Sequence, residues 1–459
     1  MEKLNNQQQH IFNKYLNGEN IFITGPGGSG KTFLIKLIVE DAINKQKQCK
    51  VCALTGCAAI LLNCGATTLH SFAGIGLAKG SVNQVVDNAV KNKYRRSNWI
   101  KTELLIIDEV SMLSLKLFII LDLIAKRIKR KRGTPFGGMQ IIFSGDFYQL
   151  PPVGNEDDPD TFKFCFETPL WNELFPQNNQ IILQTIFRQT DEKYAKILNR
   201  LRVGEVTKKG IEELQKCVNK KVDKEHNPTI LMPLRKSADI YNNIEHNKLD
   251  KTSEHIYELK PVDDIDITTD KSICDGVWSE DDKNHERQTL TNSVMVDKVI
   301  NLRIGSVVMC VINLNTNIYN GSKGVVIDFK ENNPVVKFND ITLLITPHVW
   351  QAEKIPTIGI KQLPLIYAWA ITIHKSQGMT LDTAYIDIGN FIFECGQTYV
   401  ALSRVKTLEG LYLKNLDISK ITVNMKVKNF YNNLQTQETQ ETQETQETQE
   451  TQETQETQS

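Results

Sequence analysis

The chain has 459 residues and carries 54 lysines and arginines against 54 aspartates and glutamates. Seven of the glutamates lie in a Thr-Gln-Glu repeat after Leu434 that contains no basic residue, so residues 1–434 have a net charge of +7. A mildly basic body is compatible with a nucleic-acid partner. The apolar fraction of 40% and the charged fraction of 24% are typical of a globular chain and exclude collagen, a coiled coil and wholesale disorder.

The length predicts more than one domain, because single hydrophobic cores stop growing at about 250 to 300 residues. The chain contains no uncharged apolar run of about 18 residues, so no membrane span is expected. Its first residues resemble neither a secretory signal nor a transit peptide. We therefore expect a soluble protein of the nucleus or cytoplasm, those of a host cell if the chain is viral.

Nine cysteines in a chain without a secretory signal predict reduced thiols. Two interpretations of the cluster Cys49, Cys52, Cys57 and Cys64 are considered: a zinc site, or buried thiols. Cys52 lies in an apolar, strand-like run, which favours thiols packed like apolar side chains.

In the first 185 residues, short apolar strands alternate with helical stretches. Strands are predicted at residues 20–24, 50–54, 103–107, 139–144 and 181–184, and an amphipathic helix at 32–43. Continuous apolar strands separated by helices predict a parallel sheet with both faces covered. The polar stretch 80–99 is predicted to be a small insertion on the surface of this domain.

A second α/β unit is predicted to comprise residues 186–251 and 363–434, with strands from Thr229 and at 363–370, 384–388 and 410–413. The segment 252–362 has short β-signals and turns and predicts an inserted β-barrel. Tyr367 and Trp369 alternate with apolar residues and are expected in the core. Residues 435–459 have no apolar side chain and are predicted to be disordered.

A phosphate-binding loop is the clearest motif of the chain. The pattern G-x-x-x-x-G-K-[ST] is matched, between a predicted strand and a predicted helix, by Gly25, Pro26, Gly27, Gly28, Ser29, Gly30, Lys31 and Thr32. The glycines let backbone N–H groups turn inward as an anion nest at a helix N-terminus. Lys31 is predicted to reach the β- and γ-phosphates of ATP, and the Thr32 hydroxyl to ligate Mg²⁺.

An apolar strand that ends in Asp108 and Glu109 predicts the other half of a hydrolytic site. Asp108 is expected to hold the magnesium shell, and Glu109 to orient and deprotonate the attacking water. The alternative is an acidic pair that only caps the next helix. With the phosphate loop upstream, the pair favours ATP hydrolysis.

The motifs of the chain, in their order, resemble those of the Pif-type (petite integration frequency) DNA helicases of superfamily 1, relatives of the RecD-like helicases. The resemblance extends from Leu4 to about Leu413 and includes, besides the loop and the acidic pair, residues 4–8, 54–59, 65–76, 105–112, 136–152, 187–189, 371–378 and 396–404. It implies an α/β fold with two RecA-like domains, a wedge insertion at 80–99 in the first and an SH3-like barrel at 252–362 in the second.

The resemblance also implies roles for single residues. Gln8 is expected to read adenine, Gln149 to sense the γ-phosphate, and Gly378 to belong to the nucleotide site. The motifs expected to contact the DNA strand contain Thr55, His70, Phe72, His374 and Lys375. Phe72 as a core residue, and His70 as a tie between loops, are the alternatives.

Two arginines are candidates for stabilising the charge of the transferred phosphoryl group, a contribution of about 10³ to 10⁵ in rate. Arg188 follows the last strand of the first domain, and Arg404 lies on a predicted helix of the second. A surface ion pair is the alternative for each. If Arg404 acts on a phosphate held by the first domain, catalysis requires the two domains to close.

The expected function is an ATP-dependent DNA helicase that moves 5′→3′ on single-stranded DNA and opens forked duplexes, in replication, repair, recombination or telomere maintenance. G-quadruplexes and RNA–DNA hybrids are further candidate substrates, and a monomer is expected. The stretch 80–99 shows no apolar pin, so a translocase without processive unwinding is an alternative, as is a nucleotide-gated DNA-binding factor. The basic run 126–132 at a helix end is more typical of a solvated face than of a DNA site.

The repeat after Leu434 contains Thr-Gln pairs that resemble sites of DNA-damage kinases. Phosphorylation that alters partner binding is one hypothesis. A repeat expansion without a role is the simpler one and is favoured by the composition.

Overall fold

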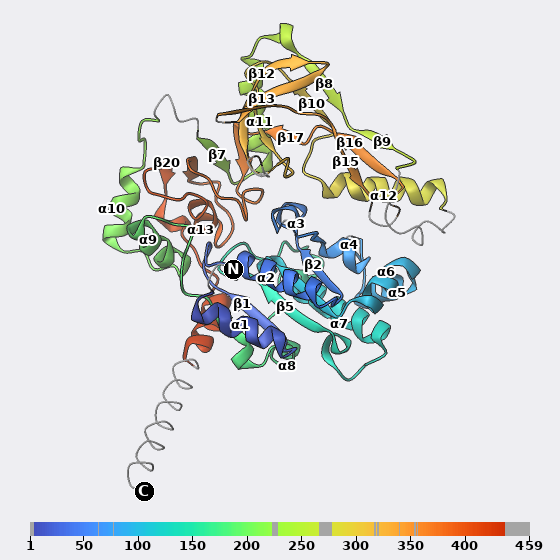
Figure 1. Cartoon of the computed structure of the whole chain (residues 1–459). Coiled ribbons are helices and arrows are strands. Elements are labelled where there is room, and N and C mark those ends of the chain that lie inside the picture. Colours follow the sequence, from blue (N-terminus) through green and yellow to red (C-terminus); the bar gives the residue numbers. More distant parts are fainter. Residues whose placement is uncertain are drawn as a thin grey trace.

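The structure is a computed structural model that describes residues 4–62, 64–76, 78–222, 228–265, 278–315, 318, 321–338, 340–352, 355 and 357–436. Nearly all of the repeat predicted to be disordered lies outside these residues. Figure 1 shows a first α/β unit in blue to cyan, a second built from green and orange-red segments, and a β-rich segment. Within the described residues, no helix combines the length and apolar character that crossing a membrane requires.

The first sheet contains six parallel strands in the order β3-β2-β4-β5-β1-β6. The strands are β1 (Ile21–Thr24), β2 (Cys49–Ala53), β3 (Thr67–Thr68), β4 (Leu104–Asp108), β5 (Gln140–Ser144) and β6 (Gln180–Ile182). The strands predicted in this region are all present to within two residues, and β3 is an additional one. The predicted parallel sheet is therefore present.

Helices cover both faces of this sheet. One face packs in a core with α1 (Asn6–Leu16), α2 (Lys31–Asn44) and α3 (Gly56–Leu62). The opposite face packs with α4 (Leu69–Ala73), α5 (Val82–Lys91), α6 (Lys93–Lys101), α7 (Leu115–Lys129) and α8 (Pro169–Leu174). Neighbouring strand residues alternate between the two cores, because successive side chains of a strand point to opposite faces.

The stretch 80–99 is not a purely superficial insertion. Its helices α5 and α6 place Val85, Val86 and Ala89 in the core of the first unit, and Trp99 is fully buried there. Although the stretch is polar overall, its few apolar residues lie on the buried side of the helices, which is an amphipathic pattern. The prediction of a surface insertion was wrong for these side chains.

The second sheet is also parallel and has the order β18-β7-β19-β20. Its strands are β7 (Thr229–Met232), β18 (Ala370–Thr372), β19 (Ala384–Ile388) and β20 (Leu411–Leu416), and the helices of this unit are α9 (Glu192–Arg202), α10 (Lys208–Lys216), α11 (Arg235–Asn247) and α13 (Gln397–Leu402). The predicted strand 363–370 is divided between two sheets. Its apolar run passes from one core to another, with Leu365 in the core of the β-rich segment and Ile371 in that of the second unit.

The β-rich segment contains three antiparallel sheets, β14-β13-β12-β11-β17, β10-β8 and β15-β16-β9. Its elements are β8 (His255–Glu258), β9 (Lys260–Val262), α12 (Glu280–Ser293), β10 (Val299–Leu302), β11 (Val307–Cys310), β12 (Lys323–Lys330), β13 (Asn333–Phe338), β14 (Ile341–Leu344), β15 (His348–Gln351), β16 (Gly359–Gln362) and β17 (Leu365–Tyr367). Helix α12 was not predicted, since Leu290 is the only apolar residue of its sequence. Tyr367 and Trp369, expected in the core, are only half-buried against two different cores.

The chain returns to the first unit at its C-terminal end. Residues 425–436 are helical, and Val427, Tyr431 and Leu434 are buried in the core formed by β1, β5, α7 and α8. The prediction assigned residues up to 434 to the second domain because they follow its last strand. Packing shows that residues 425–436 instead complete the first unit.

Candidate active site

The phosphate loop lies between β1 and α2. Gly25, Gly28 and Gly30 have φ angles of +142°, +85° and +87°, a region that side-chain-bearing residues rarely adopt. At Gly28 a Cβ atom would also lie only 2.4 Å from Cβ of Arg188. The glycines therefore allow the loop to turn and let residue 188 approach its backbone.

Lys31 begins α2 and folds back over the loop. Its Nζ donates to the carbonyl oxygens of Gly25 at 2.7 Å and Pro26 at 3.0 Å. Burial lowers the pKa of Lys31, while the carboxylates of Asp146, Glu109 and Asp108 oppose that shift. Thr32, the predicted magnesium ligand, is exposed in the first turn of α2.

The two predicted acids lie at the end of β4. Asp108 is 6% exposed, and Glu109 has the left-handed backbone angles φ +56° and ψ +42°, which cost about 1–3 kcal/mol. Burial raises the pKa of both carboxyls, and the charge of Asp108 raises that of Glu109 further. Gln377, from the second unit, donates its Nε2 to Glu109 Oε2 at 3.0 Å. The predicted acidic pair therefore lies at a contact between the two units.

Both predicted arginines lie at the phosphate loop. A Cβ placed on Gly27 would lie 3.4 Å from Nη1 of Arg188 and 3.7 Å from Nη2 of Arg404. Arg404 is 1% exposed, and its Nε donates to the Val400 carbonyl at 2.9 Å. Burial, and then the nearby charge of Arg188, lower the pKa of Arg404 to about 9. Two cations this close to each other and to an anion nest suit a polyphosphate ligand.

Two glutamines complete the surroundings of the loop. Gln149 is 5% exposed, and its buried Oε1 has no hydrogen-bond partner among the described residues. Gln8 forms a capping box with Asn5 at the start of α1. A Cβ on Gly30 would lie 2.7 Å from Nε2 of Gln8, so this amide borders the loop.

The residues predicted to contact DNA in the first unit lie on α3 and α4. The Thr55 hydroxyl accepts a hydrogen bond from Ala58 N at 3.2 Å and so caps α3. His70 is half-buried on α4, and burial lowers its pKa. Phe72 is 2% exposed, with its ring centroid 4.8 Å from that of Trp99, and so presents no face to a base. The alternative of Phe72 as a core residue is the one that the packing supports.

The remaining predicted residues lie in the turn after β18. His374 and Lys375 are half-buried, and the His374 ring lies nearly parallel to that of Phe393, with centroids 6.5 Å apart. Gly378 has a φ of +81° and follows Gln377, the residue that contacts Glu109. The turn therefore connects the predicted DNA residues with the acidic pair.

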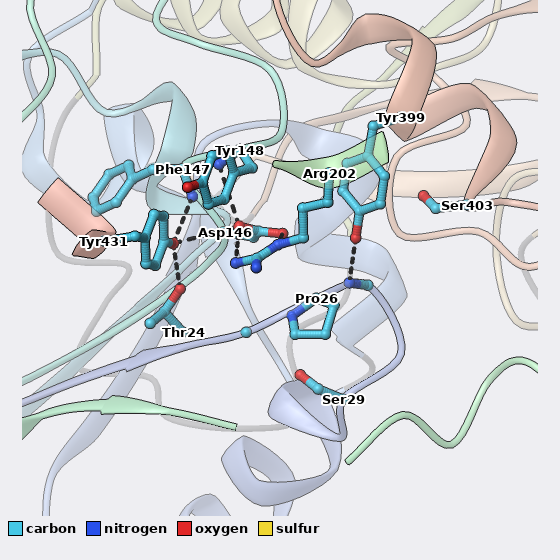
Figure 2. A network of polar contacts seen from close by, with 12 residues as sticks. Thr24, Pro26, Ser29, Asp146, Phe147, Tyr148, Arg202, Tyr399, Ser403 and Tyr431 are labelled. Atoms are coloured by element: carbon cyan, nitrogen blue, oxygen red, sulfur yellow. Dashed lines mark hydrogen bonds and ion pairs between the residues drawn. The ribbon is translucent and has the colours of Figure 1, made fainter. Parts of the chain in front are cut away.

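A set of contacts behind the loop has no signature in the sequence. Figure 2 shows Asp146, just after β5, paired with Arg202 from α9 and approached by Tyr431 from residues 425–436. The figure also shows Tyr399 of α13, whose hydroxyl accepts a hydrogen bond from Gly27 N at 2.9 Å. Asp146 and Tyr399 lie inside the quoted motifs, but Arg202 and Tyr431 lie outside them. A lone basic or aromatic residue at a helix end gives no sequence signal of its role.

Basic residues of the run 126–132, and of a second basic run at residues 93–96, make contacts inside the protein. Lys129 donates to the carbonyls of Ile100 and Thr102 at 2.8 and 2.7 Å, and Lys126 pairs with Asp122 at 2.9 Å. Arg95, in the second run, is 5% exposed and donates to Ser71 Oγ at 3.3 Å. Lys126, Lys129 and Arg95 therefore have partners within the protein, while Arg130, Lys131 and Arg132 are exposed.

The cysteine cluster is partly described. Cys52 is buried in β2, and Cys49 and Cys64 are half-buried free thiols, while the side chain of Cys57 lies outside the described residues. Burial raises the pKa of Cys49 to about 12. In the part of the chain that the structure describes, no three His, Cys, Asp or Glu side chains are grouped to hold a metal ion.

Comparison with known proteins relates this arrangement to one family. Residues 3–211 match the family model described as PIF1-like helicase. The chain is 36% identical over 444 residues to the ATP-dependent DNA helicase PIF1 of Xenopus laevis, which covers 95% of this chain and 65% of the relative. For human PIF1 the identity is 32% over 442 residues, with 94% and 64% covered. The chain thus spans about two thirds or slightly less of these relatives.

Solved structures give the same result. The crystal structure of the Pif1 helicase from Candida albicans matches with a TM-score of 0.77 and 34% identity, over 95% of this chain and 100% of that one. A Bacteroides Pif1 in complex with ADP-AlF4 matches with a TM-score of 0.72 and 26% identity, over 95% and 98%. The α/β class with parallel sheets predicted from the sequence is confirmed. By sequence and fold, the chain belongs to the PIF1-like helicase family.

Proposed function

We propose that the protein is an ATP-dependent DNA helicase that moves 5′→3′ along single-stranded DNA and opens forked duplexes. One observation carries the proposal: Arg188, in the segment between β6 and α9 that joins the two units, and Arg404, from the second unit, both reach the phosphate loop at Gly27. A passive nucleotide-binding protein needs no such pair. A motor needs them, because they make hydrolysis depend on how the domains are placed.

The residues present fit ATP and Mg²⁺. The donor set comprises a loop of backbone N–H groups, the Lys31 ammonium, the Thr32 hydroxyl and the Asp108 carboxyl, and buried Gln149 Oε1 has no partner in the described structure. Thr32 and Asp108 would hold the ion, which when bound would offset the negative charge of the phosphates. Lys31 and the two arginines would bind and orient the phosphates, and Glu109 would take a proton from the attacking water.

The charges of Arg188 and Arg404 would couple ATP hydrolysis to movement of the domains. Arg188 and Arg404 repel each other unless an anion lies between them, and both are partly or fully removed from water. A γ-phosphate therefore favours closed domains, and its loss favours opening. Gln377 and Tyr399, which also join the second unit to Glu109 and Gly27, would transmit the same change.

The DNA strand is proposed to lie across both units. In Figure 1, α3 and α4 lie between the first sheet and the β-rich segment. Thr55 and His70 on this side, with His374 and Lys375 in the turn after β18, are proposed to contact the strand. Residues 80–99 are proposed to act as the wedge, and 252–362 as the clamp.

Solved relatives support this assignment of partners. One Bacteroides Pif1 structure is bound to single-stranded DNA, and another structure concerns unwinding of forked double-stranded DNA by two coordinating Pif1 helicases. We extend the proposal to action as a monomer, and to G-quadruplexes and RNA–DNA hybrids as further substrates to be compared with the fork.

The decisive test is unwinding of forked duplexes that carry only a 5′ or only a 3′ single-stranded tail, with ATP and Mg²⁺. We expect opening of the 5′-tailed substrate alone, and strong stimulation of ATP hydrolysis by single-stranded DNA. Lys31→Ala should abolish both activities, and Lys45→Ala, near the opposite end of α2 in an exposed pair with Asp41, should retain them. A hydrolysis rate independent of DNA would refute the motor, and hydrolysis without duplex opening would select a translocase.

A further inference from the structure

A buried ion pair joins the two α/β units behind the phosphate loop. Asp146 is fully buried, and its carboxylate accepts hydrogen bonds from Nε and Nη2 of Arg202, both at 2.8 Å. Burial opposes the charge of Arg202, but the attraction of Asp146 outweighs it and raises the pKa of Arg202. The pair lies in the protein interior, where its bidentate geometry fixes distance and orientation together.

Two tyrosines enclose the pair. The rings of Tyr148 and Tyr431 are stacked at 4.7 Å with an interplanar angle of 12°, and the Arg202 guanidinium lies 4.6 Å and 5.1 Å from their centroids. The rings exclude water and attract the cation by their faces. Exchange of the pair with solvent is therefore restricted.

The Tyr431 hydroxyl connects this cluster with the phosphate loop. It lies 2.5 Å from Oγ1 of Thr24, the residue before Gly25, and accepts from Phe147 N at 3.1 Å (Figure 2). Thr24 ends β1, and the carbonyl of Gly25 is a partner of Lys31. A single hydroxyl from residues 425–436 thus holds the entrance of the loop against the turn after β5.

Arg202 connects the same cluster with the second unit. It ends α9, where Tyr194 donates its hydroxyl to the carbonyl of Leu402 in α13 at 2.7 Å. Helix α13 carries Tyr399, and Arg404 follows two residues after its end at Leu402. The turn after β5 also leads to Gln149, whose backbone N donates to the Asp146 carbonyl at 2.9 Å. The ion pair therefore links the Gln149 turn with the helix that delivers Arg404.

We propose that Asp146, Arg202 and Tyr431 are positioning residues of the ATPase: Tyr431 sets the phosphate loop for nucleotide binding, and the Asp146–Arg202 pair aligns Arg404 with the loop for hydrolysis. The inference rests on the proposed function, and it goes further by assigning a positioning role to Asp146 and to two residues outside the motifs, Arg202 and Tyr431. Loss of Tyr431 should act on nucleotide affinity. Loss of the bidentate pair should act on turnover.

Conservative variants test the two parts separately. Tyr431→Phe keeps the stacked ring and removes one hydroxyl, so the KM for ATP should rise about three- to tenfold with kcat nearly unchanged. Arg202→Lys keeps the charge and removes the fork, so kcat should fall about 10- to 100-fold with little change in affinity, because small misplacements of catalytic groups are costly. The assays are titration with a fluorescent ATP analogue without DNA, steady-state hydrolysis with single-stranded DNA, and thermal melting.

The chain offers a control for each variant outside the proposed clamp. Tyr15→Phe removes a hydroxyl that donates to the Asp41 carboxylate at 2.8 Å, and Arg200→Lys alters an ion pair with Glu205 at 3.3 Å, two residues before Arg202 on α9. Both controls should leave KM and kcat as in the unchanged protein. The proposal is overturned if Tyr431→Phe and Arg202→Lys behave like these controls. If Arg202→Lys does not fold, Tyr431→Phe decides alone. Absence of ATP hydrolysis in the unchanged protein would refute the proposed function, whereas nucleotide affinity would still report on Tyr431.

Discussion

Replacement of Arg404 by glutamine is the sharpest perturbation of the proposed motor. The side chain is almost fully buried and is held by the Val400 carbonyl, by Ser403 Oγ at 2.8 Å and by the Met379 carbonyl at 3.5 Å. Glutamine can retain part of this packing but carries no charge. The substitution therefore removes one of two cations at Gly27 without placing a small residue in the space.

The size of the effect follows from this position. A guanidinium that stabilises a phosphoryl-transfer state contributes about 10³ to 10⁵ in rate, or about 4–7 kcal/mol. We expect Arg404→Gln to lower the rate of the chemical step by that factor. Because removing one cation relieves repulsion at Arg188, the variant should fold, with a melting temperature close to that of the unchanged protein.

Single-turnover hydrolysis of ATP with saturating single-stranded DNA measures the chemical step directly. Binding of a non-hydrolysable ATP analogue shows whether the loop remains intact. A loss of less than about tenfold in the chemical step, in a variant that binds the analogue normally, would mean that Arg404 does not act on the transition state. The assignment of interdomain catalysis would then be wrong.

Two further predictions concern buried groups. Burial raises the pKa of Glu109 above its ordinary 4.5. The folded protein is therefore more stable below pH 4.5, where this carboxyl is protonated, and loses that stability as the pH rises through the folded-state pKa. At pH 8 without nucleotide, Glu109→Gln should therefore melt at a higher temperature than the unchanged protein, and below pH 4.5 it should lose this advantage. The variant should also lack ATPase activity. Equal melting curves at pH 8 would mean that the buried charge of Glu109 does not destabilise the protein. Phe72→Ala should lower the free energy of unfolding by about 3–5 kcal/mol, measured by denaturant titration, because it empties a core site beside Trp99. If Phe72→Ala instead has normal stability but binds DNA more weakly, Phe72 contacts the DNA strand.

Much of the first unit could be predicted because its signals are local. Buried parallel strands are short apolar runs, and the phosphate loop has glycines where positive φ angles are needed. Asp108, Glu109, Arg188 and Arg404 were identified from the same motifs, and all four lie at or next to the loop. The resemblance to a family supplied the order of the motifs, which composition alone does not give.

The remaining features depend on packing between distant segments. The apolar run 363–373 is continuous in sequence, yet it serves two cores, and no local pattern marks the point of division. Trp99 lies in a highly charged helix whose buried face is small. Arg202 and Tyr431 gain their importance only from Asp146 and Thr24, which lie far away along the chain.

The placement of residues 425–436 has a consequence for how the protein is made. The core around Phe22, Phe147 and Trp171 is closed by Val427, Tyr431 and Leu434, so synthesis must pass through the entire second unit before the first can be completed. A nascent chain that stops before residue 425 would leave an aromatic-lined surface uncovered. Such intermediates are natural clients for chaperones, and shortened expression products ending there should aggregate.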